Sequence, residues 1–143
     1  GKAVTGISAG TCTEPEDIAL VRALFEIVGQ VVEVPESQLD ALSTISGSGP
    51  AYVFLLIEAL TDAAVAKGFT PEQAAILVNG TFLGASTMLA ASDDGPAELR
   101  RRVTSPNGTT ERAVAVLADA DLPALFARAT DAALARAREL AAG

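Results

Sequence analysis

A turn-forming run, Ser-Pro-Asn-Gly at residues 105–108, stands directly before a segment that favours a helix from Thr109 onward. The first N–H groups of a helix have no partner within it, and the partial positive charge at that end favours an anion. Hydroxyls at Ser105, Thr109 and Thr110 could add directed hydrogen bonds without any charge of their own. The pattern indicates a pocket for a carboxylate; the competing interpretation is that Thr109 caps its own helix and nothing binds.

A second glycine-bearing segment, SGSGP at residues 46–50, resembles a phosphate-cradling loop in composition. It lacks the Gly-Lys-Ser/Thr ending of a P-loop, and it lacks the strand, glycine spacing and acidic partner of a dinucleotide fingerprint. A flexible helix entry, whose glycines let another backbone come close, is therefore favoured on local grounds.

The composition excludes several kinds of chemistry. The chain has no histidine, so it lacks the commonest general base and the commonest transition-metal ligand, and its single cysteine, Cys12, cannot build a disulfide framework or a thiolate cluster. We therefore expect no metal site. The net charge of −8 argues against nucleic-acid binding, because phosphate contacts need clustered Lys and Arg, and the only basic run is residues 100–102.

No signal peptide is evident, and the most apolar run, residues 51–57, meets Glu58 and Asp62 well short of the roughly 20 residues that a membrane span needs. We expect a soluble, cytoplasmic chain without a membrane partner. A reducing compartment also fits the lone cysteine.

The N-terminal part of the chain predicts one βαβ unit. Residues 3–8 (AVTGIS) and 30–34 (QVVEV) are β-prone, and the helix between them is expected to start at a capping box of Thr13 and Glu16 and to end at Gly29. A parallel pair of strands is normally covered by further strands and helices. We therefore expect the chain to begin inside a larger domain.

From Glu36 onward the sequence predicts an all-helical body. The expected helices cover residues 50–67, 71–91, 96–103, 109–118 and 122–140. Their signals are a stop at Gly68, a capping box at Thr70 and Gln73, and an N-cap at Asp121. The first helix has no evident polar face and must be buried, and the small residues at 80 and 84–86 in the second allow close helix packing.

Two segments, ISGSGPAYVFLLIEALTDAAVAKGF and GPAELRRRVTSPNGTTERAV, closely resemble in their order and spacing the C-terminal domain of pyrroline-5-carboxylate reductase. The resemblance covers essentially the whole chain. It implies a mainly α fold, in which residues 36–143 form a helical dimerisation and substrate-binding domain. Residues 1–35 would then be the last βαβ remnant of a Rossmann-type dinucleotide-binding domain. It also implies an intertwined, domain-swapped homodimer within a larger ring of dimers.

The resemblance also implies roles for individual residues. The family's substrate loop, typically Ser-Pro-Gly-Gly-Thr-Thr, falls on residues 105–110. Ser105 and the amides around 108–111 would take the substrate carboxylate, and Thr110, the catalytic residue, would hydrogen-bond the ring nitrogen. The implied substrate-binding set is Ser105, Asn107, Gly108, Thr109 and Thr110.

Asn107 departs from the glycine that the family usually has at this position. Asparagine is the non-glycine residue most tolerant of a left-handed backbone, so we expect the turn to survive with some change in the shape of the pocket. By the same resemblance, Ser46, Gly47 and Ser48 would lie near the nicotinamide end of the cofactor. Asp93 stands where family members often carry a carboxylate, and we assign it no role.

The implied reaction is the reduction of 1-pyrroline-5-carboxylate to L-proline with hydride from NADPH or NADH. It requires positioning and electrostatics instead of covalent catalysis, so it needs no histidine. Since the glycine fingerprint is missing, we expect this chain alone neither to bind the dinucleotide tightly nor to be active. The alternative is a purely structural helical oligomerisation module. A related imine reductase or β-hydroxyacid-type dehydrogenase is a weaker third reading, because neither would be expected to share the SPNGTT loop.

Overall fold

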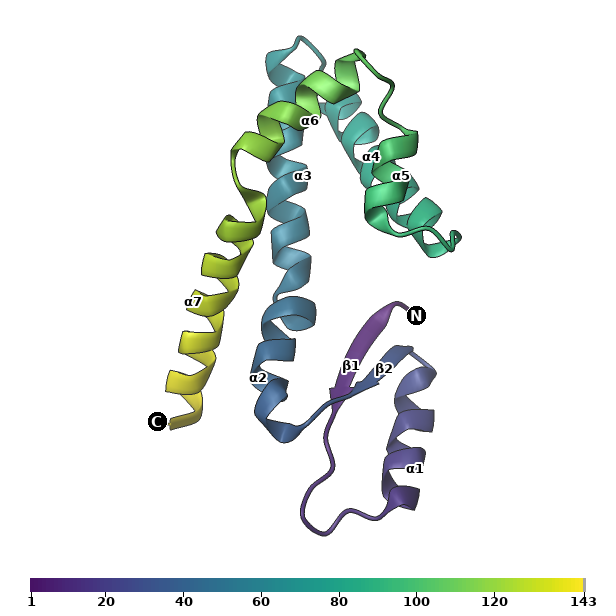
Figure 1. Cartoon of the computed structure of the whole chain (residues 1–143), viewed down its shortest axis with the longest axis vertical. Coiled ribbons are helices and arrows are strands. Elements are labelled where there is room, and N and C mark those ends of the chain that lie inside the picture. The colour runs from purple at the N-terminus through teal and green to yellow at the C-terminus, as the bar shows by residue number, and fades with distance from the viewer. Residues whose placement is uncertain (143) are drawn as a thin grey trace. The chain divides into compact units, whose positions relative to one another are not determined.

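The computed structural model describes residues 1–142 (Figure 1). The chain divides into two compact units, one formed by Gly1–Ala51 with the chain from Phe126 onward, and the other by Tyr52–Leu125. A short parallel sheet lies at the N-terminus and helices make up the remainder, so the predicted mainly α fold is confirmed. The domain boundary placed after residue 35 stays a prediction.

The predicted βαβ unit is present. It consists of β1 (Ala3–Ile7), α1 (Pro15–Glu26) and β2 (Gly29–Glu33), and the two strands are parallel, with Ala3 opposite Gly29 and Ile7 opposite Glu33. Arg22 joins the helix to the second strand, because its guanidinium donates to the Val31 carbonyl at 3.3 Å and pairs with Glu33 at 2.9 Å. Because the two strands are parallel, their carboxyl ends lie at the same edge of the sheet, and the pocket described below lies at that edge.

Two details of this unit differ from the prediction. The helix is capped by Glu14, whose N–H donates to the Asp17 carboxylate at 3.0 Å, whereas the Thr13 hydroxyl accepts a bond from the Gly10 N–H at 2.8 Å. Pro15 is the reason, because proline favours the first helical position and so places the cap one residue before it.

Gly29 does not end the helix, which finishes at Glu26. It is the first residue of β2, and a Cβ there would overlap the carbonyl oxygen of Ala3 on the neighbouring strand. The glycine is thus required by the close approach of two strands and not by helix termination.

The expected flexible entry at residues 46–50 is instead helical. A 3₁₀ turn, η1 (Glu36–Gln38), leads into α2 (Leu39–Leu42) and a π-helical turn, η2 (Ser43–Gly47). Side-chain hydroxyls in this stretch donate to carbonyls three or four residues earlier: Ser43 to Asp40 at 2.8 Å, Thr44 to Ala41 at 2.7 Å and Ser46 to Leu42 at 3.3 Å. Such back-bonding satisfies the hydroxyls within a helical path and often bends it, and π-turns often occur at functional sites.

The remaining elements are the predicted helices. They are α3 (Gly49–Ala66), α4 (Pro71–Ala90), α5 (Pro96–Arg102), α6 (Thr109–Asp119) and α7 (Leu122–Ala142). Gly68 has a φ of 97° and ends α3, with its N–H donating to Val65 at 2.9 Å and the next N–H to Ala64 at 3.4 Å. These two bonds form a Schellman motif, and they confirm the helix stop predicted at Gly68.

Two further helix starts follow the prediction. Thr70 and Gln73 form the capping box of α4, since the Gln73 N–H donates to the Thr70 hydroxyl at 3.2 Å and the Thr70 N–H to the Gln73 side chain at 3.0 Å. Asp121, with a φ of 47°, accepts the Ala124 N–H at 3.3 Å before α7. Local side-chain chemistry therefore sets these boundaries.

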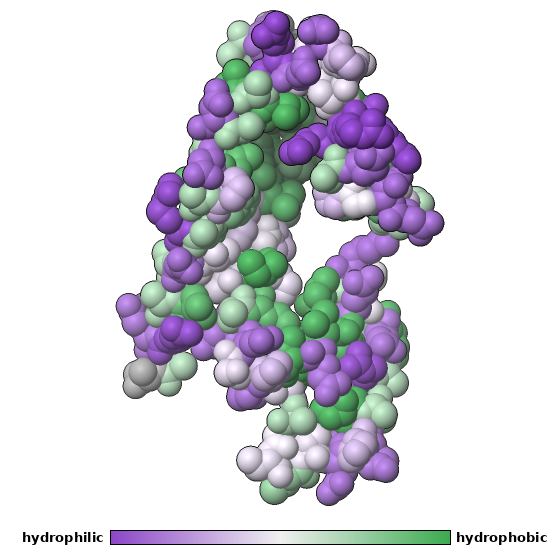
Figure 2. Space-filling view, viewed as in Figure 1, coloured by the Kyte–Doolittle hydropathy of each residue, from purple (hydrophilic) through white to green (hydrophobic). Residues whose placement is uncertain are grey.

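Few apolar residues of the described chain are buried, and Figure 2 shows hydrophobic side chains lying open on the face in view. The buried hydrophobic residues are Ile7, Ala74, Val78 and Leu99. The expectation that α3 must be buried is not met within this chain, because none of its residues is buried and Phe54 and Leu55 are 66% and 65% exposed. Apolar surface of this extent needs a cover that one copy of the chain does not supply.

The helical stretches Glu36–Ala66 and Pro71–Ala90 are long and apolar enough to cross a bilayer by length and composition alone. Core helices of soluble proteins satisfy the same criterion, so this is weak evidence for a membrane span. The expectation of a chain without a membrane partner stays a prediction.

Candidate functional site

The segment between α5 and α6 is built around a tight turn. The Gly108 N–H donates to the Ser105 carbonyl at 3.0 Å, which closes a β-turn with Pro106 and Asn107 at its centre. Asn107 has a φ of 58°, so its backbone is left-handed, which is the positive φ that a type II turn, unlike type I, needs at its third residue. The expectation that asparagine preserves the turn is confirmed.

The first turn of α6 leaves its amides free. Gly108 is the N-cap, without a side-chain capping bond, and Thr109 is already the first helical residue, so the interpretation in which Thr109 caps its own helix is wrong. The first backbone bond into the helix runs from the Arg112 N–H to the Gly108 carbonyl at 3.4 Å. Within residues 1–142, no backbone acceptor is bonded to the N–H groups of residues 109–111.

Three hydroxyls surround these amides in the sequence. Ser105, Thr109 and Thr110 are all exposed, and no side-chain hydrogen bond within the described residues engages their hydroxyls. Three N–H groups and three hydroxyls of this segment are therefore unbonded within the described residues. The helix dipole would favour an anion there by about 0.3–1 kcal/mol when exposed and by up to about 2 kcal/mol when partly buried. The chemistry suits a carboxylate.

Glu111 is a residue of this loop whose side chain the sequence reasoning missed. One of its carboxylate oxygens accepts the N–H of Asn107 at 2.8 Å, reaching back from the third helical position to the turn. The signal was available, because glutamate at this position commonly reaches back to amides before the helix.

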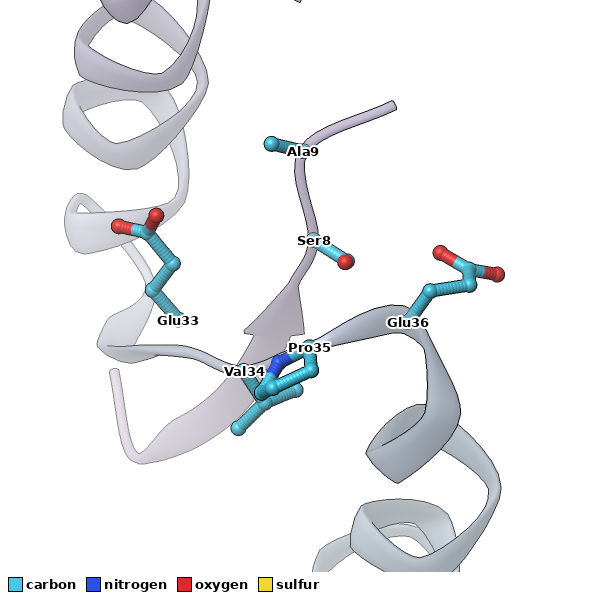
Figure 3. A pocket seen from close by; sticks show the side chains of 6 residues that line it. All are labelled: Ser8, Ala9, Glu33, Val34, Pro35 and Glu36. Carbon is cyan, nitrogen blue, oxygen red and sulfur yellow. The ribbon is translucent and has the colours of Figure 1, made fainter. Parts of the chain in front are cut away.

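A separate pocket lies at the carboxyl ends of the two parallel strands (Figure 3). It has a volume of about 440 Å³ and is lined by Ser8, Ala9, Glu33, Val34, Pro35 and Glu36. Ligands of open α/β sheets bind at this end of the strands, so the position is chemically meaningful. The sequence reasoning missed these residues, although Ser8 directly follows a strand.

The side chains give this pocket a mixed character. In Figure 3 Ser8 lies between Glu33 and Glu36, with its hydroxyl on the side of Glu36. Two carboxylates repel phosphate but accept hydrogen bonds from sugar hydroxyls or amides, so the pocket does not suit a pyrophosphate. The predicted cofactor residues, Ser46 to Ser48, belong to the π-helical turn and its C-cap and do not line it.

Comparison with known proteins decides the family. The family described as "Pyrroline-5-carboxylate reductase dimerisation" matches residues 36–140. The chain is 42% identical over 140 residues to the pyrroline-5-carboxylate reductase of Synechocystis sp., a match covering 98% of this chain and 52% of that protein. The chain belongs to the pyrroline-5-carboxylate reductase family. The Arabidopsis thaliana enzyme of the same name is 44% identical over 140 residues and is covered to 51%.

Solved structures of the family share this fold. A pyrroline-5-carboxylate reductase from Coxiella burnetii superposes with a TM-score of 0.92 at 41% identity, over 96% of this chain and 51% of that one. The Plasmodium falciparum pyrroline carboxylate reductase with NADP bound gives 0.81 at 29% identity, over 94% and 55%. The chain thus spans about half the length of the reductases that it matches.

In this reductase-family chain the basic run before the loop of residues 105–110 is largely neutralised by neighbouring carboxylates. Arg101 donates two hydrogen bonds to Glu98, at 2.8 and 2.6 Å, and Arg102 pairs with Glu98 at 3.1 Å and with Asp94 at 2.6 Å. The hydrogen bonds from Arg101, and after them the hydrogen bond and the charge of Arg102, hold the pKa of the Glu98 carboxyl below its ordinary value. These pairs connect α5 to the loop before it, where Asp93 is exposed.

Proposed function

We propose that this chain is the C-terminal part of a pyrroline-5-carboxylate reductase, which reduces 1-pyrroline-5-carboxylate to L-proline. The observation that carries the proposal is the open start of α6, where the unbonded amides of residues 109–111 lie next in the chain to the exposed hydroxyls of Ser105, Thr109 and Thr110. A carboxylate is the group of this substrate that such a site binds best.

Each part of the loop has a role in this proposal. Ser105 and the amides of residues 109–111 donate to the substrate carboxylate, which stays charged throughout the reaction. The Thr110 hydroxyl oxygen accepts a hydrogen bond from the N–H of the protonated imine ring. Because the ring already carries its proton, Thr110 orients it and does not act as an acid. The turn at Asn107 sets the position of both groups.

NADPH or NADH would supply the hydride, which adds to the ring carbon of the C=N bond while the nitrogen takes the electron pair and becomes an amine. The pocket of Ser8, Glu33 and Glu36 fits the hydroxyl-bearing and nicotinamide end of such a cofactor better than its phosphates. We place Ser46, Gly47 and Ser48 at the same end of the cofactor, on the family resemblance alone. The phosphate-binding residues belong to the part of the enzyme that this chain does not cover.

A second copy of the chain is the proposed cover for the exposed apolar helices. The family description names dimerisation, and none of the residues of α3 is buried within the described part of the chain. We propose an intertwined homodimer, further assembled into a ring of dimers, in the reducing cytoplasm. Neither a nucleic acid nor a bilayer is part of this proposal.

The proposal is tested by restoring the missing half. A fusion enzyme, made of the N-terminal half of the Synechocystis reductase joined to this chain, is expected to oxidise NADPH when given 1-pyrroline-5-carboxylate. The chain alone should neither turn over substrate nor bind NADPH at micromolar concentration in a calorimetric titration, because the pyrophosphate needs the absent glycine turn. A fusion enzyme that binds NADPH but never turns over would favour the structural oligomerisation module instead.

Ser105→Ala in the fusion enzyme should raise the KM for the substrate and the inhibition constant of a proline-like carboxylic acid by about threefold to tenfold. It should change kcat little, because the carboxylate is bound equally in the ground state and the transition state. Thr104→Ala is the matched control, since the Thr104 hydroxyl already donates to the Arg100 carbonyl at 2.7 Å. Equal effects from both variants would remove Ser105 from the carboxylate site.

A further inference from the structure

We propose that Glu111 is a positioning residue, which holds Asn107 in its left-handed conformation and thereby fixes the amide end of the carboxylate site. This inference rests on the proposed function for its kinetic consequence. Its structural part, the hold of one side chain on one backbone amide, stands on the 2.8 Å hydrogen bond from the Asn107 N–H to the Glu111 carboxylate.

The turn needs such a hold because of the residue at its third position. Asn107 has a φ of 58°, and a left-handed backbone costs free energy for any residue that has a Cβ. The turn is closed by the 3.0 Å hydrogen bond from the Gly108 N–H to the Ser105 carbonyl, so Asn107 lies between two fixed ends. A small change at Asn107 would therefore move the amides that follow it.

Glu111 is placed to resist that change. It lies in the first turn of α6, three residues after the N-cap Gly108. Its carboxylate accepts a hydrogen bond from the N–H of Asn107, the residue directly before the N-cap. By binding Asn107, the side chain leaves the N–H groups of residues 109–111 open for a ligand. A carboxylate that folded onto those amides would instead occupy the site itself.

Whereas the positioning role of Glu111 would strengthen the binding of a ligand carboxylate, its negative charge would weaken that binding. A negative group beside an anion site repels the anion, so a purely electrostatic role predicts tighter substrate binding after the charge is removed. A positioning role predicts weaker binding after the acceptor is removed. Glu111→Gln removes the charge but keeps an oxygen acceptor, and Glu111→Ala removes both, so the two variants separate the roles.

The kinetic test uses the fusion enzyme with both substitutions. Glu111→Ala should raise KM by about threefold to tenfold, as expected for the loss of one hydrogen bond, while Glu111→Gln should stay close to the parent. Asn107→Gly provides the second background, because glycine adopts the left-handed conformation without the cost of a Cβ. In the Asn107→Gly background, Glu111→Ala should change KM by less than about twofold. The difference between the two backgrounds is the coupling between Glu111 and Asn107, which a double-mutant cycle measures.

Hydrogen exchange of the Asn107 amide in the 143-residue chain gives a readout that needs no activity. Glu111→Ala should speed this exchange several-fold, and Glu111→Gln should speed it less. Unchanged exchange in Glu111→Ala would overturn the proposal, as would lower KM values for both Glu111 variants or the same KM penalty in both backgrounds. If the parent fusion enzyme were folded but inactive, the proposed function would fail while the exchange rates still decided the role of Glu111.

Discussion

Thr110→Ala in the fusion enzyme is expected to lower kcat/KM by roughly tenfold to a hundredfold. In the proposed complex the Thr110 hydroxyl accepts a hydrogen bond from the charged N–H of the imine ring, and the loss of a hydrogen bond to a charged partner costs about 1.5–3 kcal/mol. The side chain is exposed in this chain and is not bonded within the described residues, so its removal breaks no internal hydrogen bond there. The measurement is the rate of NADPH oxidation over a range of substrate concentrations.

Conservative and structural controls separate this role from a folding defect. Thr110→Ser keeps the hydroxyl and should retain much of the activity, whereas an alanine variant that merely unfolded α6 would lose helix signal in circular dichroism. Because Thr110 orients the ring, a substantial part of the loss should appear in kcat, unlike the KM effect expected for Ser105. A Thr110→Ala enzyme with kcat/KM within about twofold of the parent would remove Thr110 from the ring-nitrogen contact.

The elements that the sequence predicted best are those whose ends depend on neighbours in the chain. The Thr70 and Gln73 capping box, the left-handed Gly68 and the cap at Asp121 each act within a few residues. Such bonds are encoded by residue type and spacing alone, so periodicity and capping rules recover the helices that they bound.

The errors arose where a contact or a competing signal lay outside the local pattern. Gly29 resembled a helix stop, but its reason is the backbone of Ala3, 26 positions earlier on the partner strand. The π-helical turn at Ser43–Gly47 depends on hydroxyls that bond back to carbonyls, and apolar periodicity contains no information about them. Glycine and serine in that segment therefore suggested a loop.

The candidate site shows the same division. The turn and the left-handed Asn107 follow from residue type, as does the anion preference of a helix start. The backward reach of Glu111 follows from its third helical position, but the choice of the Asn107 amide as its partner is visible only in the coordinates. The strand-end pocket joins Ser8 to Glu33 and Glu36, which come together only because the two strands pair in parallel.

The second large effect is expected at α3. Phe54→Asp should convert a dimer into monomers or prevent folding, because an aromatic side chain that is 66% exposed in one copy would be buried by the second. Burying a phenylalanine contributes about 1.5–3 kcal/mol per copy, and burying an unpaired carboxylate in its place costs several kcal/mol more. Sedimentation equilibrium of the parent and variant chains measures the change.

Ile27→Asp is the matched control, since Ile27 is 78% exposed but lies outside residues 36–140, the segment matched by the dimerisation family. It should leave the sedimentation of the chain unchanged. The parent should remain dimeric on dilution to nanomolar concentration, because an obligate interface of this kind buries more than about 2,000 Å² and its folded monomer is unstable.

Two outcomes would contradict the proposed interface. A compact, stable parent monomer at nanomolar concentration would show that the apolar face of α3 needs no second copy. A parent chain that stays in solution only with detergent, or that floats with lipid vesicles, would assign the exposed helices to a bilayer, for which two of them have sufficient length and apolar composition. If a second copy covers α3, the parent chain should form a dimer without detergent, which Phe54→Asp disrupts and Ile27→Asp leaves intact. The two substitutions add the same charge, so a difference between them reflects the position of the charge, in α3 or directly after α1.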